Sequence, residues 1–177
     1  MNKKLLLPFS LTAFVIILDQ AVKQFIVTKW PLEGRQGRFI ADIFGNGFLE
    51  IYHVRNKAIA FSLGRNLPDS LRPVLFILVP LAVIIFLIWY YFKSDEFSTL
   101  QRWAVAGIIG GGIGNIADRI FRPDGVVDFV SIALYGLLGM DRWPTFNVAD
   151  SSVVACCGIL LISMIFAKRT QKLEVSS

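Results

Sequence analysis

Residues 73–92 form a run of twenty residues without a charged side chain, and this run limits the folds open to the chain. A helix of about twenty residues crosses the hydrocarbon core of a bilayer, which is roughly 30 Å thick. The run ends in the aromatic cluster Trp89-Tyr90-Tyr91-Phe92, a composition typical of a membrane interface. Overall, 55% of residues are hydrophobic and 18% are charged, which is too apolar for a soluble domain of this size. The sequence therefore predicts an integral membrane protein.

Three further segments are mostly apolar and long enough to span a bilayer. The predicted helices cover residues 5–27, 72–92, 103–120 and 148–167. The first follows Lys3 and Lys4, as in a secretory signal peptide, but no small-residue cleavage site follows it and the apolar pattern continues to Val27. We therefore expect a retained helix and a single integral membrane domain, residues 1–177, with four transmembrane helices and a polar, frayed tail after Ala167.

The segment 28–71 between the first two helices has a different pattern. Its residues 48–55 alternate between apolar and polar side chains, which predicts a strand. A second strand-like run, residues 126–130, surrounds Asp128 in the link between the last two helices. The predicted fold class is thus membrane α-helical, with a small β-sheet between helices one and two that lies at the membrane surface and leans on the helices.

Polar side chains interrupt or border the apolar spans at a few positions: Asp19, Lys23, Asn115, Asp118, Arg119, Asn147 and Asp150. Ionisable groups are costly inside a membrane, so their presence suggests function. Consecutive helices alternate in direction, so helices one and three end on the membrane face where helix four begins. We therefore expect these side chains to gather at one depth, beneath the 28–71 segment.

Spacing adds two local predictions. Gly107, Gly111, Asn115 and Arg119 recur at every fourth residue and form one stripe of a helix, with a small half suited to close packing and a polar half facing the site. Packing alone is an equally good explanation of the glycines. Asp19 and Lys23 are four residues apart, which permits an ion pair, although both side chains could instead reach the interface.

Asp128 and Asp150 form the chemically most suggestive pair. Two neighbouring carboxylates can divide acid and base work, because burial and like charge keep one of them protonated. The alternative is that Asp150 is a helix N-terminal aspartate and Asp128 a solvated turn residue. The single histidine, His53, argues against a histidine metal cluster, and Cys156 and Cys157 suit a helix core. No metal or cofactor is expected.

Five motifs in order resemble those of bacterial lipoprotein signal peptidases, also called signal peptidase II. They are Asp19-Gln20-x-x-Lys23, Asn56-x-x-x-Ala60-Phe61-Ser62, Gly111-x-x-Gly114-Asn115-x-x-Asp118-Arg119, Val126-Val127-Asp128-Phe129 and Phe146-Asn147-x-Ala149-Asp150-Ser151. The resemblance spans almost the whole chain.

The resemblance implies an intramembrane aspartyl endopeptidase that removes signal peptides from diacylglyceryl-modified prolipoproteins, immediately before the lipidated cysteine. It implies a catalytic pair, Asp128 and Asp150, which together activate water. It also implies two supporting groups. One group would shape the site and bind substrate: Asn56, Asn115, Arg119 and Asn147. The other would support the structure: Asp19, Lys23, Gly111, Gly114 and Asp118. The family's sheet is a small periplasmic β-cradle.

One departure from the family pattern lies in the second motif. A glycine is expected two residues after Asn56 and a small residue after that, whereas this chain has Ala58 and Ile59. The bulkier side chains would reshape the loop that covers the substrate, and the reaction class would stay the same.

The expected location is the bacterial inner membrane, with cytoplasmic termini and the active site near the periplasmic face. Lysines and arginines flank both terminal helices, although the loops of the opposite face carry more of them. The expected partners are prolipoproteins and membrane phospholipids, with the protein monomeric. Nucleic acid is not expected, because no basic aromatic platform accompanies the net charge of +5.

Two other classes of function are compatible with residue chemistry alone. A small transporter could use the buried charges as an ion or proton relay, but a relay should distribute them through the whole bilayer thickness. A non-enzymatic scaffold could use the glycine stripe as an oligomer interface, in which case Asp128 and Asp150 would be dispensable.

Overall fold

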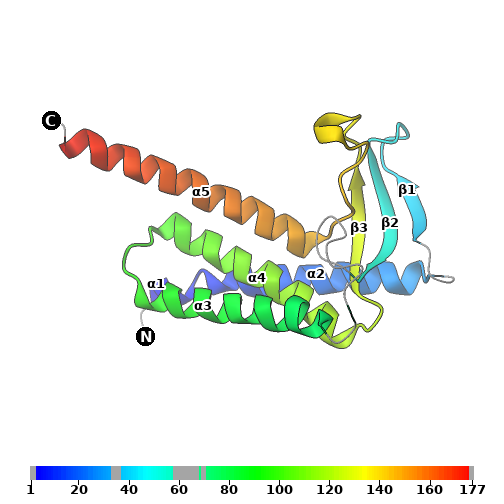
Figure 1. Ribbon diagram of the computed structural model, residues 1–177, viewed down its shortest axis with the longest axis horizontal. Coiled ribbons are helices and arrows are strands. Elements are labelled where there is room, and N and C mark those ends of the chain that lie inside the picture. Colours follow the sequence, from blue (N-terminus) through cyan, green and yellow to red (C-terminus); the bar gives the residue numbers. More distant parts are fainter. Residues whose placement is uncertain (1–2, 33–36, 58–67, 69–70, 176–177) are drawn as a thin grey trace.

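The computed structural model describes residues 3–32, 37–57, 68 and 71–175, with the side chains of residue 138 and of 167–175 left aside. Long helices lie side by side in one direction, and a small sheet stands across one end of them (Figure 1). Both termini lie toward the end opposite the sheet. The loop that was predicted to be reshaped by Ala58 and Ile59 lies outside the described residues.

The N-terminal span is broken by a proline. Helix α1 covers Lys3–Leu6 and α2 covers Phe9–Lys29, so the break falls at Leu7 and Pro8. Proline lacks the N–H that would continue the helical ladder, which accounts for the break. The second span begins as the π-helix η2, Val74–Leu78, and continues as α3, Val79–Lys93, with Pro80 at the junction. The widened turn there accommodates the missing proline N–H.

The last two long helices are α4, Thr99–Phe121, and α5, Val148–Val175. A complete capping box fixes the start of α4: Gln101 N–H donates to the Ser98 hydroxyl, and the Gln101 side chain accepts from Ser98 N–H. The predicted start at residue 103 was therefore four residues late. Helix α5 continues through the polar residues after Ala167, where fraying was predicted.

Among the described helices, three are long and apolar enough to cross a membrane: Lys3–Lys29, Val74–Lys93 and Val148–Phe166. Helix α4 is long enough too, but glycines and charged residues lower its hydropathy. It also has the largest share of buried residues, in contact with α2, α3 and α5. The third predicted helix, residues 103–120, is thus the interior helix of the bundle, and this position explains why it tolerates polar side chains.

The sheet has three antiparallel strands in the order β1-β2-β3. Strands β1, Arg38–Asp42, and β2, Leu49–Asn56, come from the segment predicted to form the sheet. Strand β3, Val126–Ile132, comes from the link between α4 and α5. The prediction of a sheet was correct, but its placement between helices one and two was incomplete, since the third strand joins from far along the chain.

Two apolar clusters join these elements. Ile84, Tyr91, Val105, Ile109 and Ile116 form the core between α3 and α4. A second cluster, Ile26 with Val127 and Phe129, fastens the end of α2 to β3. Because β3 carries Asp128, the second cluster also fixes the base of the predicted site against the helices.

Glycines of α4 allow both neighbouring helices to approach closely. A Cβ at Gly110 would lie 3.1 Å from Thr12 Cα in α2. A Cβ at Gly111 would collide with the carbonyl oxygen of Ala149, in the first turn of α5. Gly107 lies similarly against the Sγ of Cys156. The glycine stripe is therefore a packing surface, and it brings the start of α5 against α4 at the level of Asn115.

Gly111→Ala should destabilise the protein by about 1–3 kcal/mol, because its Cβ would meet backbone that cannot move without shifting α5. Gly158→Ala is the matched control, since a Cβ at this α5 position meets nothing within 4 Å. Thermal unfolding in detergent should show a lower Tm for the first variant and an unchanged or higher Tm for the second. Equal Tm values for both variants would contradict close packing at Gly111.

Candidate functional site

A buried ion triad lies at the sheet end of the bundle. The Lys23 amino group is 2.7 Å from Asp19 Oδ2 in α2 and 3.1 Å from Asp118 Oδ2 in α4, and all three side chains have no exposed surface. The predicted Asp19–Lys23 pair is thus confirmed, and it is shared with a third residue. One cation between two carboxylates leaves a formal charge of −1, which the surrounding donors must offset.

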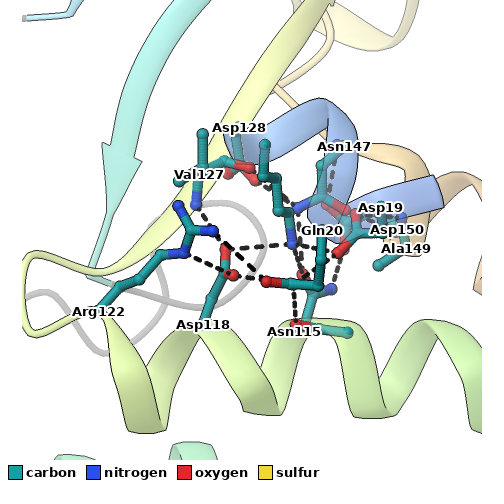
Figure 2. A network of polar contacts seen from close by, with 12 residues as sticks. Asp19, Gln20, Asn115, Asp118, Arg122, Val127, Asp128, Asn147, Ala149 and Asp150 are labelled. Carbon is teal, nitrogen blue, oxygen red and sulfur yellow. Dashed lines mark hydrogen bonds and ion pairs between the residues drawn. The ribbon is translucent and has the colours of Figure 1, made fainter. Parts of the chain in front are cut away.

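Those donors come from three elements. Asp118 Oδ1 accepts a hydrogen bond of 3.0 Å from the Gln20 side-chain amide and forms an ion pair of 3.2 Å with Arg122 Nε. Asp118 Oδ2 accepts the backbone N–H of Val127 at 3.0 Å (Figure 2). The Asp118 carboxylate therefore holds α2, α4 and β3 together. It is bound to β3 at Val127, the residue before Asp128.

Asp19 does the same for the start of α5. Its Oδ1 accepts the backbone N–H of Ala149 at 3.0 Å, one residue before Asp150. A Cβ at Gly114 would lie 2.8 Å from the other oxygen of this carboxylate, so glycine provides the space in which Asp19 lies. Each member of the predicted catalytic pair is therefore preceded by a residue whose N–H is held by a carboxylate of the ion triad.

Asn147 and Asp150 cap the start of α5 reciprocally. The backbone N–H of Asp150 donates to Asn147 Oδ1 at 2.9 Å, and the backbone N–H of Asn147 donates to Asp150 Oδ2 at 3.2 Å. This arrangement has the geometry of a capping box, with aspartate in place of the usual glutamate. Asp150 thus lies in the first turn of α5, as the alternative interpretation had it, and the cap also fixes the direction of its side chain.

Two asparagine amides link the predicted catalytic carboxylates (Figure 2). Asn147 Nδ2 donates to Asp128 Oδ1 at 2.7 Å and to Asn115 Oδ1 at 3.1 Å. Asn115 Nδ2 in turn donates to Asp150 Oδ1 at 2.7 Å. The chain Asp128–Asn147–Asn115–Asp150 thus connects β3 to α5 through α4, with hydrogen bonds only.

The bridge is tied to the ion triad. Lys23 Nζ donates to Asn115 Oδ1 at 3.2 Å, so this amide oxygen accepts from both Lys23 and Asn147. Because the oxygen is occupied by two donors, the Asn115 NH₂ group must point the other way, toward Asp150.

The two carboxylates lie in different surroundings. Asp128 is 2% exposed, and its Oδ2 accepts a hydrogen bond of 2.9 Å from Asn56 Nδ2 in β2. Burial raises the pKa of Asp128 to about 7, an effect that the negative charge of Asp150 increases and the Asn56 hydrogen bond opposes. Asp150 is half-buried at a helix N-terminus, where backbone N–H groups favour a carboxylate. The two carboxyl groups therefore differ in burial and in their hydrogen-bond partners.

Arg119 is half-buried and lies within electrostatic reach of both Asp150 and Asp128, and its Nη1 donates to the Asn115 carbonyl at 3.1 Å. Its guanidinium is a nearby positive charge for the pair. Among the described residues, no cluster of three or more His, Cys, Asp or Glu side chains is suited to hold a metal ion. The carboxyl groups, amides and guanidinium gathered here are groups suited to acid–base chemistry.

Comparison with known proteins agrees with this site. The family model described as signal peptidase (SPase) II matches residues 11–166. The lipoprotein signal peptidase of Treponema pallidum (strain Nichols) is 39% identical over 176 residues, covering 99% of this chain and 90% of the relative. That of Treponema denticola is 43% identical over 159 residues, covering 89% and 88%. The chain belongs to the signal peptidase II family.

Solved structures support the fold of this signal peptidase II family member. One bacterial membrane enzyme, solved at 1.9 Å resolution, has a TM-score of 0.71 and 25% identity, covering 89% of this chain and 91% of that one. Another, solved at 2.3 Å, has the same TM-score with 24% identity, covering 91% and 88%. Together with the family match, these structures show that the chain is an enzyme, a peptidase, and a multi-pass bacterial membrane protein.

Within this signal peptidase II fold, most residues singled out from sequence come together. Asn56, Asn115, Asn147, Asp128 and Asp150 form one hydrogen-bonded group. Asp19, Lys23 and Asp118 form the ion triad beside it, with Gly114 against Asp19. Gly111 lies against α5 and contributes through packing.

Two side chains of the network were missed as site residues. Gln20 donates to Asp19, Asp118 and the Gly114 carbonyl, and Arg122 pairs with Asp118 and lies 3.4 Å from Gln20 Oε1. The i, i+4 spacing of Asp118 and Arg122 was a usable signal, and Gln20 stood inside a quoted motif. His53 proves structural: it is buried in β2, and its Nδ1 donates to the Trp30 carbonyl at 2.7 Å. Burial lowers the pKa of His53, which keeps the ring neutral.

Lys23→Met should destabilise the protein by about 3–5 kcal/mol, because Asp19 and Asp118 would then lie buried with no cation between them. Lys29→Met, at an exposed position of the same helix, is the control and should have little effect. Denaturant unfolding in detergent measures both. Adding Asp118→Asn to Lys23→Met should recover part of the loss, and a double variant less stable than Lys23→Met would contradict the charge argument.

Proposed function

We propose that this chain is an intramembrane aspartyl endopeptidase that removes the signal peptide from diacylglyceryl-modified prolipoproteins, immediately before the lipidated cysteine. Asp128 and Asp150 act as the catalytic pair and activate water. The observation that carries the proposal is the amide bridge of Asn147 and Asn115, which joins two carboxyl groups with different surroundings.

The different surroundings suggest how the two carboxyl groups divide the reaction. Asp128, whose pKa is about 7, takes the role of the acid, and Asp150 at the N-terminus of α5 takes the role of the base. Asp150 takes a proton from a water molecule while the oxygen of that water attacks the scissile carbonyl carbon. At the same time Asp128 donates its proton to the carbonyl oxygen. The tetrahedral intermediate then collapses: one hydroxyl proton returns to Asp128, the C–N bond breaks, and Asp150 protonates the leaving amine.

Neighbouring residues assist these steps in the proposed mechanism. Asn147 and Asn56 each donate to one oxygen of Asp128, so they fix the orientation of its carboxyl plane. Asn115 does the same for Asp150. Arg119 supplies positive charge near both groups and is suited to bind a substrate carbonyl. Asn56, Asn115, Arg119 and Asn147 thus shape the site.

The substrate class fits the position of the site. The relatives named above are lipoprotein signal peptidases. A lipid-anchored substrate reaches its scissile bond from within the bilayer, so the catalytic groups must lie at the membrane edge. Asp128 and Asp150 lie at the sheet end of the helices, where α2 and α4 end and α5 begins.

An ion or proton relay is less compatible with the arrangement of charges. The ion triad and the carboxyl pair all lie at the sheet end of the bundle, and η2 and α3 carry no charged residue before Lys93. A conduction path would require polar groups toward the opposite face as well.

We also propose the orientation of the chain. The two termini share one end of the bundle and the sheet lies at the other (Figure 1). With Lys3 and Lys4 beside the first span, the termini would be cytoplasmic and the sheet and catalytic pair periplasmic.

Asp128→Asn and Asp150→Asn should each lower kcat by a factor of about 10²–10⁴, because either change removes one half of the acid–base pair. The control is Asp124→Asn, an exposed residue in the turn before β3, which should cleave normally. The assay is the gel shift of a diacylglyceryl-modified prolipoprotein in detergent, with circular dichroism to verify folding. Folded Asp128→Asn or Asp150→Asn protein with wild-type kcat would exclude the aspartyl mechanism.

The kcat of the wild-type enzyme should fall as pH rises through about 7, because Asp128 then loses the proton that it donates. In Asn56→Leu this alkaline limb should move to higher pH, since the lost hydrogen bond favoured the ionised carboxylate and lowered its pKa. The measurement is kcat against pH for both proteins, each normalised to its own maximum. An alkaline limb that moves to lower pH in the variant would argue against Asp128 as the acid.

A further inference from the structure

Two loops at the far end of the sheet display large apolar side chains. The loop between β1 and β2 carries Ile43, Phe44 and Phe48, and the segment after β3 carries Tyr135, Leu137 and Trp143. All six side chains are exposed, Phe44 by 62% and Tyr135 by 74%. We name these six residues the loop patch. None of them belongs to either apolar cluster described above.

The two loops form one continuous surface. The backbone N–H of Ala133 donates to the Phe48 carbonyl at 2.8 Å, and Arg142 Nη1 donates to the Gly47 carbonyl at 2.8 Å. Arg142 also forms an ion pair of 2.9 Å with Glu50 in β2. The loop patch is therefore held together by bonds beneath it.

Both loops are fixed in shape. The Asp42 carboxylate accepts the backbone N–H groups of Phe44, Gly45 and Gly47 at 3.2, 3.0 and 2.6 Å. Tyr135 has a φ of 53°, a left-handed conformation that is uncommon and costly for a bulky residue. Its N–H donates to the Asp141 carbonyl at 3.2 Å. Phe44 and Tyr135 are thus exposed on loops whose backbone is held in a defined conformation.

The position of the loop patch indicates what covers it. The strands run across the direction of the helices, so the far end of β3 stays, along the helix direction, between the start of α5 and the end of α2 (Figure 1). A strand of seven residues carries this end about 23 Å sideways. In Figure 1 it extends past the start of α5. The outward face of α5 is apolar and exposed at Val154 and Leu161, as expected for contact with lipid.

We propose that the loop patch is a membrane anchor that enters the interfacial layer of the bilayer spanned by the helices. Its occupant is phospholipid, at the boundary between headgroups and acyl chains. Tyrosine, tryptophan and phenylalanine beside aliphatic residues are the side chains that this layer favours. The strand that carries the patch is also joined to the start of α5, because the Phe129 and Val130 N–H groups both donate to the Phe146 carbonyl, two residues before α5 begins.

The test measures the depth of nitroxide labels in full-length protein reconstituted in phospholipid nanodiscs. A background protein with both Cys156→Ala and Cys157→Ala has no native thiol that could react with the label. Phe44→Cys and Tyr135→Cys carry the label in separate proteins. Two references are Leu161→Cys, on the lipid-facing side of α5, and Asp95→Cys, in the exposed polar link between α3 and α4. Collision of each label with oxygen and with a water-soluble nickel chelate reports its surroundings.

Labels at 44 and 135 should collide several-fold less with nickel than the label at 95, and their collision with oxygen should lie between the values for the labels at 95 and 161. Nickel collision equal to that at 95 would overturn the proposal, because the loops would then lie in water. Low collision with both reagents would also overturn it, because a protein surface or a second copy would then cover the patch.

A second variant tests whether the apolar side chains themselves hold the loops in lipid. With the label at Leu137→Cys, adding Phe44→Ser and Tyr135→Ser should raise nickel collision several-fold. An unchanged value would show that the loops reach lipid without these side chains, and the anchor would be rejected. The catalytic pair is intact in every variant, so this test does not depend on the proposed peptidase activity.

Discussion

The shared charge of Lys23 is the interaction on which the rest of the site depends. Removing three ionisable side chains from water is costly, and only short, complete pairing offsets that cost. Here one amino group serves two carboxylates, and each carboxylate also holds a backbone N–H beside the proposed catalytic pair: Val127 for Asp118 and Ala149 for Asp19. The relative position of β3 and the start of α5 therefore follows from the size of one ion cluster, with Gly114 leaving the space for it.

Asparagine is the natural link between this cluster and the carboxyl pair. A carboxamide both donates and accepts, so it connects two carboxyl groups without adding charge. A lysine in the place of Asn115 or Asn147 would favour ionisation of both aspartates, and a carboxylate there would oppose it. The observed bridge fixes the orientation of the two carboxyl groups, while burial raises the pKa of Asp128.

Much of this arrangement was readable from sequence because it rests on local rules. The length of residues 73–92 predicts a span, and the i, i+4 spacing of Asp19 and Lys23 predicts their ion pair. Alternating helix directions predict that the polar ends meet. Contacts between distant segments were harder to foresee. Nothing local indicates that β3 pairs with β2, that Asp118 accepts the Val127 N–H, or that Gln20 reaches α4. The motifs identified the residues, and only the fold gave their partners.

The sheet links the catalytic and peripheral parts of the molecule through a single strand. At one end of β3, Asp128 is held by the ion triad and by the apolar cluster with Ile26. At the other end, Ala133 and Arg142 fasten the strand to the loop between β1 and β2. A strand supported at one end alone could tilt relative to the membrane plane, and Asp128 would change depth with it. Contact of the far loops with lipid would supply the second support. The proposed peptidase needs this constraint, because its substrate would be anchored in the same bilayer and the scissile bond would arrive at a depth set by the lipid.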